Sequence, residues 1–285
     1  MKLVKMSPYE IHRELFELMR DIKRICDDNQ IRFFLGFGTM LGSIRDGGFI
    51  PWDDDLDILV LREDWNRFNK CILEQLDKEK YFVINAYTRK EYPYWAFITR
   101  LGINGTYRKM DYFKENKAFR SGIFIDAFVI EDVIDSPSLL KMQQFGLKII
   151  DEQIDRKSKK KEYQSKMSIS GRILGIMAGS KWSLETCNMI RNTVQTCLAT
   201  YNATKLLVPM GPLGKYPLEK TLYDKKWFRE EVEVPFNLIK DSEVLDTLYL
   251  PIPIEYEKIL EKTYGKWKRR PRGKRPKGVS YWIKK

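Results

Sequence analysis

Apolar and polar residues alternate along the first half of the chain with periods that predict helices and strands in turn. Residues 9–29 and 63–76 carry apolar side chains three and four positions apart, which is the spacing of an amphipathic helix. Between and after them, short apolar runs bounded by turn residues predict strands. These runs are residues 31–38, 53–60, 81–88, 94–101, 106–109 and 121–130. The last run is apolar on both faces, as is typical of a central strand.

The pattern changes after these strands, and residues 137–201 are predicted to be mostly helical. Residues 156–161 form a basic interruption. Residues 168–182 place glycines among apolar residues, and we interpret them as a buried connection rather than a segment at a membrane surface. From residue 206 the chain is predicted to form strands and turns, followed by a last helix within residues 251–265.

Composition indicates a folded chain, for which we expect an α+β fold with three segments. Hydrophobic residues make up 43% of the chain and aromatic residues 13%, which excludes wholesale disorder. We expect residues 1–135 to form the core domain, residues 136–265 a helical and mixed region, and residues 266–285 a tail. No apolar run approaches the roughly 20 residues of a membrane-spanning helix. The first ten residues lack the pattern of a signal peptide, so we expect a cytoplasmic protein.

Cysteine and histidine usage narrows the chemistry. The chain has four cysteines, none of them in a CxxC motif, and a single histidine, His12. This nearly excludes a zinc site built from Cys and His pairs, and also a catalytic triad that uses another histidine. We interpret the cysteines as reduced core thiols and His12 as a helix residue at the surface or the edge of the core.

The positive charge is concentrated in the tail. The chain has 51 basic and 39 acidic residues, a net charge of +12, and residues 266–285 hold ten of the basic residues and no acid. The remaining 41 basic and 39 acidic residues nearly cancel, so the body does not resemble a nucleic-acid-binding protein. We interpret the tail as a contact for an anionic surface or, alternatively, as a solvated segment that aids solubility.

Residues 33–60 hold the most informative pattern. A strand runs into Gly38 and Thr39 at a helix start, where backbone N–H groups can bind phosphate and the hydroxyls of Thr39 and Ser43 add donors. Asp55 and Asp57 follow on the next predicted strand, where alternation points both to one face. Two carboxylates beside a phosphate cradle outline a site for Mg²⁺, or alternatively Mn²⁺, with a di- or triphosphate. The competing interpretation is a solvated Asp-rich turn.

Asp126 and two arginines extend this outline. Asp126 stands alone among apolar residues, where burying an unpaired carboxylate is costly, so we predict a third site carboxylate rather than a loop cap. Because clustered carboxylates repel each other, replacing Asp126 with Ala is expected to remove activity but little stability. Arg100 and Arg108 flank a turn near the predicted site and are either phosphate ligands or ordinary surface residues.

The stretch at residues 33–60, FFLGFGTMLGSIRDGGFIPWDDDLDILV, resembles the signature of the LicD family, a branch of the nucleotidyltransferase superfamily. The family stretch reads roughly GTLLGAxRHxGFIPWDDDxD. SGIFIDAFVI at residues 121–130 and the closing Tyr264-Gly265 resemble the family as well. Two features depart from the pattern: Asp46 replaces a usual histidine, and a basic tail follows Gly265. These departures leave open which molecule accepts the group that such an enzyme would transfer.

The resemblance implies a nucleotidyltransferase-like mixed β-sheet flanked by helices, with a mostly helical C-terminal part that completes the acceptor side. It implies Mg²⁺-dependent transfer of phosphocholine, or a related phosphoalkyl group, from CDP-choline or another CDP-linked donor, releasing CMP. The implied acceptor is a sugar hydroxyl of a cell-surface glycan or lipid-linked saccharide, as in lipopolysaccharide, teichoic acid or capsule, at the inner face of the cell membrane. By similarity, Asp55 and Asp57 bind the metal and are catalytic, and Asp126 is the third carboxylate, which binds a second metal ion or draws the acceptor hydroxyl into line. Gly38, Thr39 and Ser43 bind donor phosphate by the same similarity.

A choline head group would need aromatic faces rather than hydrogen-bond partners. Trp52 immediately precedes the aspartates, and Tyr92, Tyr94 and Trp95 cluster just before a predicted strand. We predict a donor-binding role for Trp52 and consider an aromatic cage there, with ordinary core packing as the alternative.

Three other functions stay open from the sequence. A nucleotidyltransferase that adds a nucleotide to a small molecule or sugar phosphate would use the same metal site and release pyrophosphate. A glycosyltransferase with a DxD motif normally has a longer nucleotide-binding half before the motif, which here comes at residue 55. A non-catalytic protein that binds anionic surfaces through its tail would leave the three aspartates unexplained.

Overall fold

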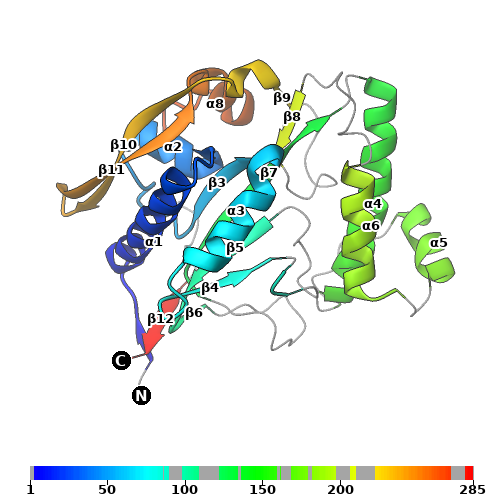
Figure 1. The fold of residues 1–285 in the computed structure, drawn as a ribbon, viewed down its shortest axis with the longest axis horizontal. Coiled ribbons are helices and arrows are strands. Elements are labelled where there is room, and N and C mark those ends of the chain that lie inside the picture. The colour runs from blue at the N-terminus through cyan, green and yellow to red at the C-terminus, as the bar shows by residue number, and fades with distance from the viewer. Residues whose placement is uncertain are drawn as a thin grey trace.

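A computed structural model of the chain shows an α+β fold built around a mixed β-sheet (Figure 1). The structure describes residues 3–85, 87–89, 98–108, 122–133, 136–158, 161, 168–178, 182–196, 206–209, 222–270 and 280–284. In spatial order, the main strands are β2 (Phe33–Leu35), β3 (Leu56–Leu61), β7 (Phe124–Val133), β5 (Ile98–Ile103) and β4 (Tyr81–Ile84). Two further strands belong to this sheet: β8 (Leu206–Pro209) pairs with the C-terminal end of β7, and β9 (Tyr223–Asp224) pairs with β8.

The centre of the sheet is the parallel pair of β3 and β7. β2 pairs antiparallel with β3, β5 with β7, and β4 with β5. The apolar run at 121–130 therefore forms a central strand, as predicted, and Ile125 and Val129 on it are completely buried. β3 begins at Leu56 rather than at residue 53, so Asp55 precedes the strand instead of lying on it.

Two helices, α1 (Pro8–Asp28) and α3 (Arg62–Gln75), lie side by side across the sheet and contact β7 (Figure 1). Ser7 and Glu10 form a capping box at the start of α1, and Pro8 occupies the first helical position. The apolar stripe predicted for this helix is buried against the sheet. His12 on the same helix is buried at the edge of the core, as expected. Cys26, Cys71 and Cys187 are buried free thiols, as interpreted, and Cys197 lies outside the described residues.

A long hairpin covers the edge of the core next to β2. It consists of β10 (Glu231–Lys240) and β11 (Glu243–Pro253), and it is preceded by η3 (Lys225–Phe228) and followed by α8 (Tyr256–Tyr264). The short helix α2 (Phe37–Arg45) contacts β3, β10 and α8, so it is held between the sheet and the hairpin.

The two ends of the chain meet in a small sheet (Figure 1). Its strands are β1 (Leu3–Lys5), β12 (Tyr281–Lys284) and β6 (Thr106–Arg108), with β12 in the middle. The end of the basic tail is thus a strand that pairs with β6, where it lies beside Arg108.

Three helices form a separate layer beyond the end of the sheet (Figure 1). They are α4 (Pro137–Ser158), α5 (Ile169–Ala178) and α6 (Leu184–Thr196). α6 and α5 each pack on α4. Within residues 168–182, our expectation of a buried connection is wrong for α5, which is a regular helix with Ile169, Ile173, Ile176 and Met177 exposed, although its Leu174 packs against the core cluster beneath it.

Candidate active site

Two carboxylates lie opposite each other where the parallel strands begin. Asp57 on β3 and Asp126 on β7 are partners in the strand register, and Asp55 lies just before β3. Burial, and then the charges of Asp55 and Asp126, raise the pKa of Asp57 well above its usual range. Burial, and then Asp53 and Asp126, raise the pKa of Asp55 to about 7. The cluster therefore concentrates negative charge that a proton or a cation would relieve.

Arg100 is directed at Asp126. The two residues are partners in the antiparallel register of β5 and β7, and the guanidinium donates to both Asp126 oxygens, at 2.8 and 2.7 Å. The Arg100 guanidinium also lies 3.7 Å from the ring centroid of Phe124. Both side chains of the ion pair are largely buried. Arg100 is thus at the predicted site, where it neutralises one of the carboxylates.

Asp53 and Asp54, which are not among the site residues predicted from the sequence, also belong to the acidic cluster. One oxygen from each of Asp53, Asp54 and Asp55 lies within 4.8 Å of the others, a spacing that suits a metal ion. Burial, and then the charge of Asp54, raise the pKa of Asp53 to about 6. The three consecutive aspartates were visible in the sequence as a possible metal site. A strand pattern places only every second residue on one face, but this run lies before β3, so all three carboxylates can approach one another.

A buried histidine fixes the backbone of this acidic run. His12 Nε2 lies 2.8 Å from the carbonyl oxygen of Asp53, and its ring stacks on Phe49 with centroids 4.1 Å apart. Since a carbonyl can only accept, Nε2 is the donor. Burial lowers the pKa of His12, so the ring is neutral at physiological pH.

The turn between β2 and α2 is hydrogen-bonded to the start of β3. The N–H of Gly36 donates to the Asp57 carbonyl at 2.8 Å, and the N–H of Asp57 donates to Thr39 Oγ1 at 2.8 Å. A Cβ on Gly38 would lie 3.0 Å from Asp53 Oδ2, so glycine allows the carboxylate to approach the first turn of the helix. Thr39 thereby sets the position of Asp57.

Ser43 lies one helical turn further along and faces the interior. Its hydroxyl donates to the carbonyl of Met40 at 2.8 Å, and both Thr39 and Ser43 are buried. In this structure the two hydroxyls contact backbone groups of the protein itself. Their predicted role as donor-phosphate ligands stays a prediction.

The two departures from the family pattern, Asp46 and the basic tail, meet each other. Asp46 is buried at the end of α2 and accepts hydrogen bonds from Arg45 at 2.7 Å and from Arg270 of the tail at 2.8 Å. The Arg270 guanidinium also lies 5.9 Å from the ring centroid of Trp52. Trp52 is partly buried and packs against the core. An acid at position 46 thus recruits a base of the tail to the loop that carries Trp52 and the aspartates.

The tail also approaches the carboxylate site through its last strand, β12. Its Tyr281 is completely buried, and the Arg108 guanidinium lies 5.8 Å from the centroid of that ring. Arg108 also lowers the pKa of Asp55, although burial and the neighbouring acids raise it more. Arg108 therefore acts electrostatically on Asp55, although the described part of the structure shows no direct contact between it and the carboxylates. Tyr92, Tyr94 and Trp95 lie outside the described residues.

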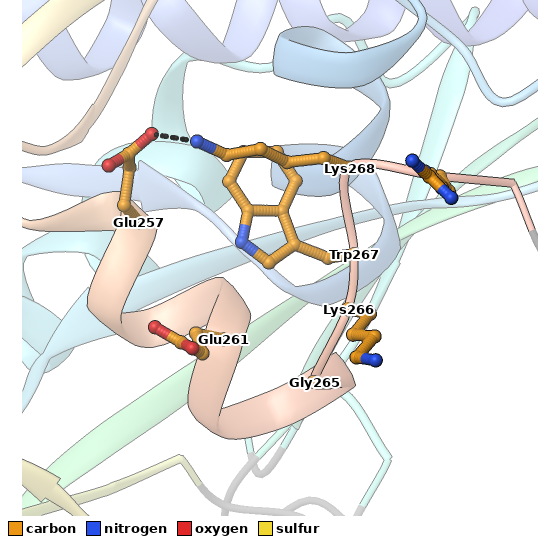
Figure 2. Close-up of a pocket in the computed structure, with 7 residues that line it drawn as sticks. Glu257, Glu261, Gly265, Lys266, Trp267 and Lys268 are labelled. Atoms are coloured by element: carbon orange, nitrogen blue, oxygen red, sulfur yellow. Dashed lines mark hydrogen bonds and ion pairs between the residues drawn. The ribbon is translucent and has the colours of Figure 1, made fainter.

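A cavity of about 500 Å³ lies along α8 and the first residues of the tail, separate from the carboxylates. Figure 2 shows Lys268 reaching across Trp267 to Glu257, with a distance of 2.9 Å between the charged atoms. Glu261 and Lys266 also line the cavity, so acids and bases are mixed there. The predicted site residues are absent from its lining, and its ion pair attaches the tail to α8.

Comparisons with known proteins identify the segment that carries the site. Residues 30–136 match the family model described as LicD/FKTN/FKRP, nucleotidyltransferase domain. The lipopolysaccharide cholinephosphotransferase LicD of Haemophilus influenzae is 27% identical over 121 residues, which are 41% of each protein. Uncharacterized proteins of Rickettsia typhi and Rickettsia prowazekii are 40% and 39% identical over 58 and 69 residues. These cover 20% and 24% of this chain and 19% and 26% of the relatives.

Each of these matches spans less than half of this chain and less than half of the relative. Terminal uridylyl transferase 4 from Trypanosoma brucei with bound GTP is a similar solved structure at 12% identity, over 75% of this chain and 66% of that one. Its TM-score of 0.21 is too low to say anything about shared architecture. The family match includes every residue predicted from the sequence to form the site. Residues 30–136 of the chain are therefore similar to the nucleotidyltransferase domain of the LicD family.

Proposed function

We propose that this protein is a phosphotransferase that moves phosphocholine, or a related phosphoalkyl group, from a CDP-linked donor to a sugar hydroxyl of a cell-surface glycan. CMP is the other product. The observation that carries the proposal is the pairing of Asp57 with Asp126 across β3 and β7, beside the start of α2, inside the segment that matches the family. The name of the Haemophilus influenzae relative, a lipopolysaccharide cholinephosphotransferase, supports phosphocholine and a glycan acceptor.

Mg²⁺ is the proposed metal, and the residues present fit it. Magnesium prefers hard oxygen ligands, and carboxylates of the acidic run lie close enough together to share one ion. The raised pKa values of Asp55 and Asp57 indicate a site that holds excess negative charge until a cation binds. Asp55 and Asp57 would hold the ion, with Asp126 as the third carboxylate. When bound, the ion would neutralise phosphate oxygens of the donor and stabilise the departing CMP.

The protein's own groups would position the donor and acceptor. The backbone amides at Gly38 and Thr39 begin α2, and such amides favour a phosphate group. Both oxygens of Asp126 accept from Arg100, so Asp126 is better suited to hold that guanidinium beside the transferred phosphoryl group than to take a proton.

A product assay tests this function directly. The protein is incubated with Mg²⁺, a glycan acceptor, and each of CDP-choline, CDP-ethanolamine, CDP-ribitol and CDP-glycerol in turn. We expect CMP release and labelling of the acceptor with one donor, and loss of both with Asp57→Asn. Asp132→Asn is the matched control, because Asp132 lies on β7 and pairs with Lys225, away from the site. Turnover by Asp57→Asn equal to that of the wild type would remove the basis of the proposal.

The same assay distinguishes the main alternative. A nucleotidyltransferase that adds a nucleotide to a small molecule or sugar phosphate would release pyrophosphate from a nucleoside triphosphate instead of CMP. The description of the matching family as a nucleotidyltransferase domain favours this alternative over the other two considered above. Pyrophosphate release that depends on Asp57, without CMP release from any CDP-linked donor, would replace the proposed reaction by this one.

The tail's proposed contact with an anionic membrane has to compete with contacts inside the protein. Within the described part of the tail, Lys268 pairs with Glu257 and Arg270 with Asp46. β12 is held between β1 and β6. No helix in the described part of the chain is both long and apolar enough to cross a bilayer.

A further inference from the structure

The layer formed by α4, α5 and α6 exposes an unusual amount of apolar surface. α5 lies outermost in this layer, at the edge of the molecule (Figure 1). On this helix Ile169, Ile176 and Met177 are 78%, 80% and 79% exposed. The other exposed large apolar side chains of the layer are Leu139, Met142 and Phe145 on α4, Ile173 on α5 and Met189 on α6. Scattered apolar residues are normal on a protein surface, but a contiguous group marks an interaction site.

The way α5 is attached turns this apolar face outward. A Cβ on Gly171 would lie 1.8 Å from Oε2 of Glu152, so a larger residue there would have to displace the Glu152 carboxylate from Ser168. The contact itself is polar: Ser168 donates from Oγ to Glu152 at 2.8 Å, and Gln153 donates from Nε2 to the carbonyl of Gly171 at 2.7 Å. With its small and polar side held against α4, the helix presents its large apolar residues to the solvent.

A groove between α4 and α5 continues this surface. It has a volume of about 360 Å³, and its lining is almost entirely apolar, with Ile149 on α4, Ile173 and Leu174 on α5, and Val194 on α6. The exposed side chains and the groove therefore form one apolar face on two neighbouring helices. We call it the α4–α5 face.

The charges around the α4–α5 face are of one sign. Every exposed charged residue on these two helices is basic, and these residues are Lys141, Lys148, Arg156 and Arg172. The acids of α4 point elsewhere: Glu152 and Asp155 are buried, and Asp151 accepts a hydrogen bond from the buried Arg191 at 2.6 Å. An apolar face bordered by basic side chains is complementary to an anionic lipid surface, where the bases meet head groups and the apolar residues enter the interface.

We propose that the α4–α5 face docks the protein on an anionic bilayer, with Ile169, Ile176 and Met177 entering the interface. The proposal goes beyond the proposed transfer reaction and does not depend on it, because vesicle binding needs no turnover. A second copy of the chain is the less suitable occupant. Two identical faces would bring the basic residues of both copies together, and like charges oppose such contacts.

Vesicle sedimentation of the full-length protein tests the proposal. Vesicles of phosphatidylcholine with phosphatidylserine at 3:1 are compared with vesicles of phosphatidylcholine alone, at low and at physiological salt. We expect binding to the mixed vesicles, weakened by salt, and at least tenfold weaker binding of the double variant Ile176→Glu and Met177→Glu. The matched control carries Val244→Glu and Leu245→Glu at the exposed tip of the hairpin, and it should bind like the wild type.

Two further variants distinguish vesicle binding through the α4–α5 face from vesicle binding through the tail. Lys141→Gln with Lys148→Gln removes charge from the face, and Lys266→Gln with Arg269→Gln removes the same charge from exposed positions of the tail. We expect the first pair to weaken binding several-fold and the second to have the smaller effect. Thermal unfolding should show that each variant keeps the wild-type melting temperature, since all these residues are exposed.

Three results would overturn the proposal. The first is wild-type binding by the Ile176→Glu and Met177→Glu variant. The second is loss of binding only with the tail pair, which would assign the membrane contact to the tail. The third is a wild-type dimer in light scattering that this double variant converts to a monomer, without vesicle binding by the wild type, which would assign the face to a second copy.

Discussion

The carboxylate site and the α4–α5 face violate the ordinary distribution of residues in opposite directions. At the first, Asp57 and Asp126 are held close together beneath the surface, where ionised groups are costly. At the second, Ile176 and Met177 are about 80% exposed, where apolar side chains gain nothing from burial. Both regions are fixed by specific contacts, Thr39 to Asp57 in one and Ser168 to Glu152 in the other.

The comparison shows how a missing ligand can be inferred from chemistry. A buried excess of negative charge is relieved by a cation, and an exposed apolar face with basic borders is relieved by an anionic lipid surface. The two regions also differ in whether the rest of the chain offsets the unfavourable charge or exposure. Arg100 neutralises Asp126 at the site, whereas no described part of the chain covers the outer side of α5. Changes at the two regions should therefore separate into effects on turnover and effects on location.

The largest effect is expected for Asp57→Asn. Turnover should fall by about 10³-fold or more, because a group that stabilises charge in the transition state is lost. Without Mg²⁺ the same variant should be more stable than the wild type at pH 8. The raised pKa of Asp57 means that its ionised form destabilises the fold, and this destabilisation disappears as the pH falls toward 4. Kinetics and thermal unfolding at both pH values measure the two effects. A variant with lower stability at pH 8 would contradict the electrostatic explanation.

Arg100→Gln should have the next largest effect and should act on both turnover and stability. It leaves Asp126 buried without its guanidinium partner, which destabilises by about 3 kcal/mol for a pair of this kind. The matched control is Arg62→Gln, which breaks the pair with Glu131 on the same strand. Both variants should unfold at lower denaturant concentration, but only Arg100→Gln should reduce turnover of the folded protein. Equal turnover in the two variants would limit Arg100 to a structural role.

The ion pair also revises what the sequence implies for Asp126→Ala. Repulsion between clustered carboxylates predicts little loss of stability on removing one of them. The structure instead pairs Asp126 with Arg100 through two hydrogen bonds, so the variant would leave a largely buried guanidinium without its main acceptor. We now expect Asp126→Ala to lower both turnover and stability. Sequence analysis could not foresee this, because Arg100 is 26 residues away and reaches Asp126 only through the pairing of β5 with β7.

Much of the core could be predicted because local patterns determine it. The helix at residues 8–28 and the central strand ending at Val133 follow from apolar spacing, within a few residues of their ends. The aspartates were recognisable because their spacing and neighbours form a specific motif. What failed was the placement of α5, since apolar residues favour burial in a sequence. Its outward face depends on Gly171 meeting Glu152, a contact between separate helices that no local pattern records.

The affinity for Mg²⁺ should depend on pH, and the dependence sharpens the electrostatic half of the comparison. The ion binds ionised carboxylates, whereas Asp53 and Asp55 have pKa values of about 6 and about 7. Affinity should therefore rise from pH 6 to pH 7, by about fivefold through Asp55 and about twofold through Asp53, and the contribution of these two groups should level off above pH 7. Titration calorimetry in two buffers with different ionisation enthalpies counts the protons released. Binding without proton release at pH 6.5 would show that the carboxylates are already ionised.

The smallest effect is expected for Arg270→Gln, which removes the tail's contact with the loop that carries Trp52. Asp46 keeps Arg45 as a partner, and Arg270 is half exposed, so the loss should be about 1 kcal/mol, or roughly 2 °C in Tm. Because Arg270 lies beside Trp52, the KM for the donor should rise a few-fold while kcat stays nearly constant. Lys268→Gln is the control, since its partner Glu257 lies on α8 and both groups are well exposed. If Lys268→Gln raises KM equally, the effect comes from general loosening of the tail, and Arg270 has no particular role at the loop.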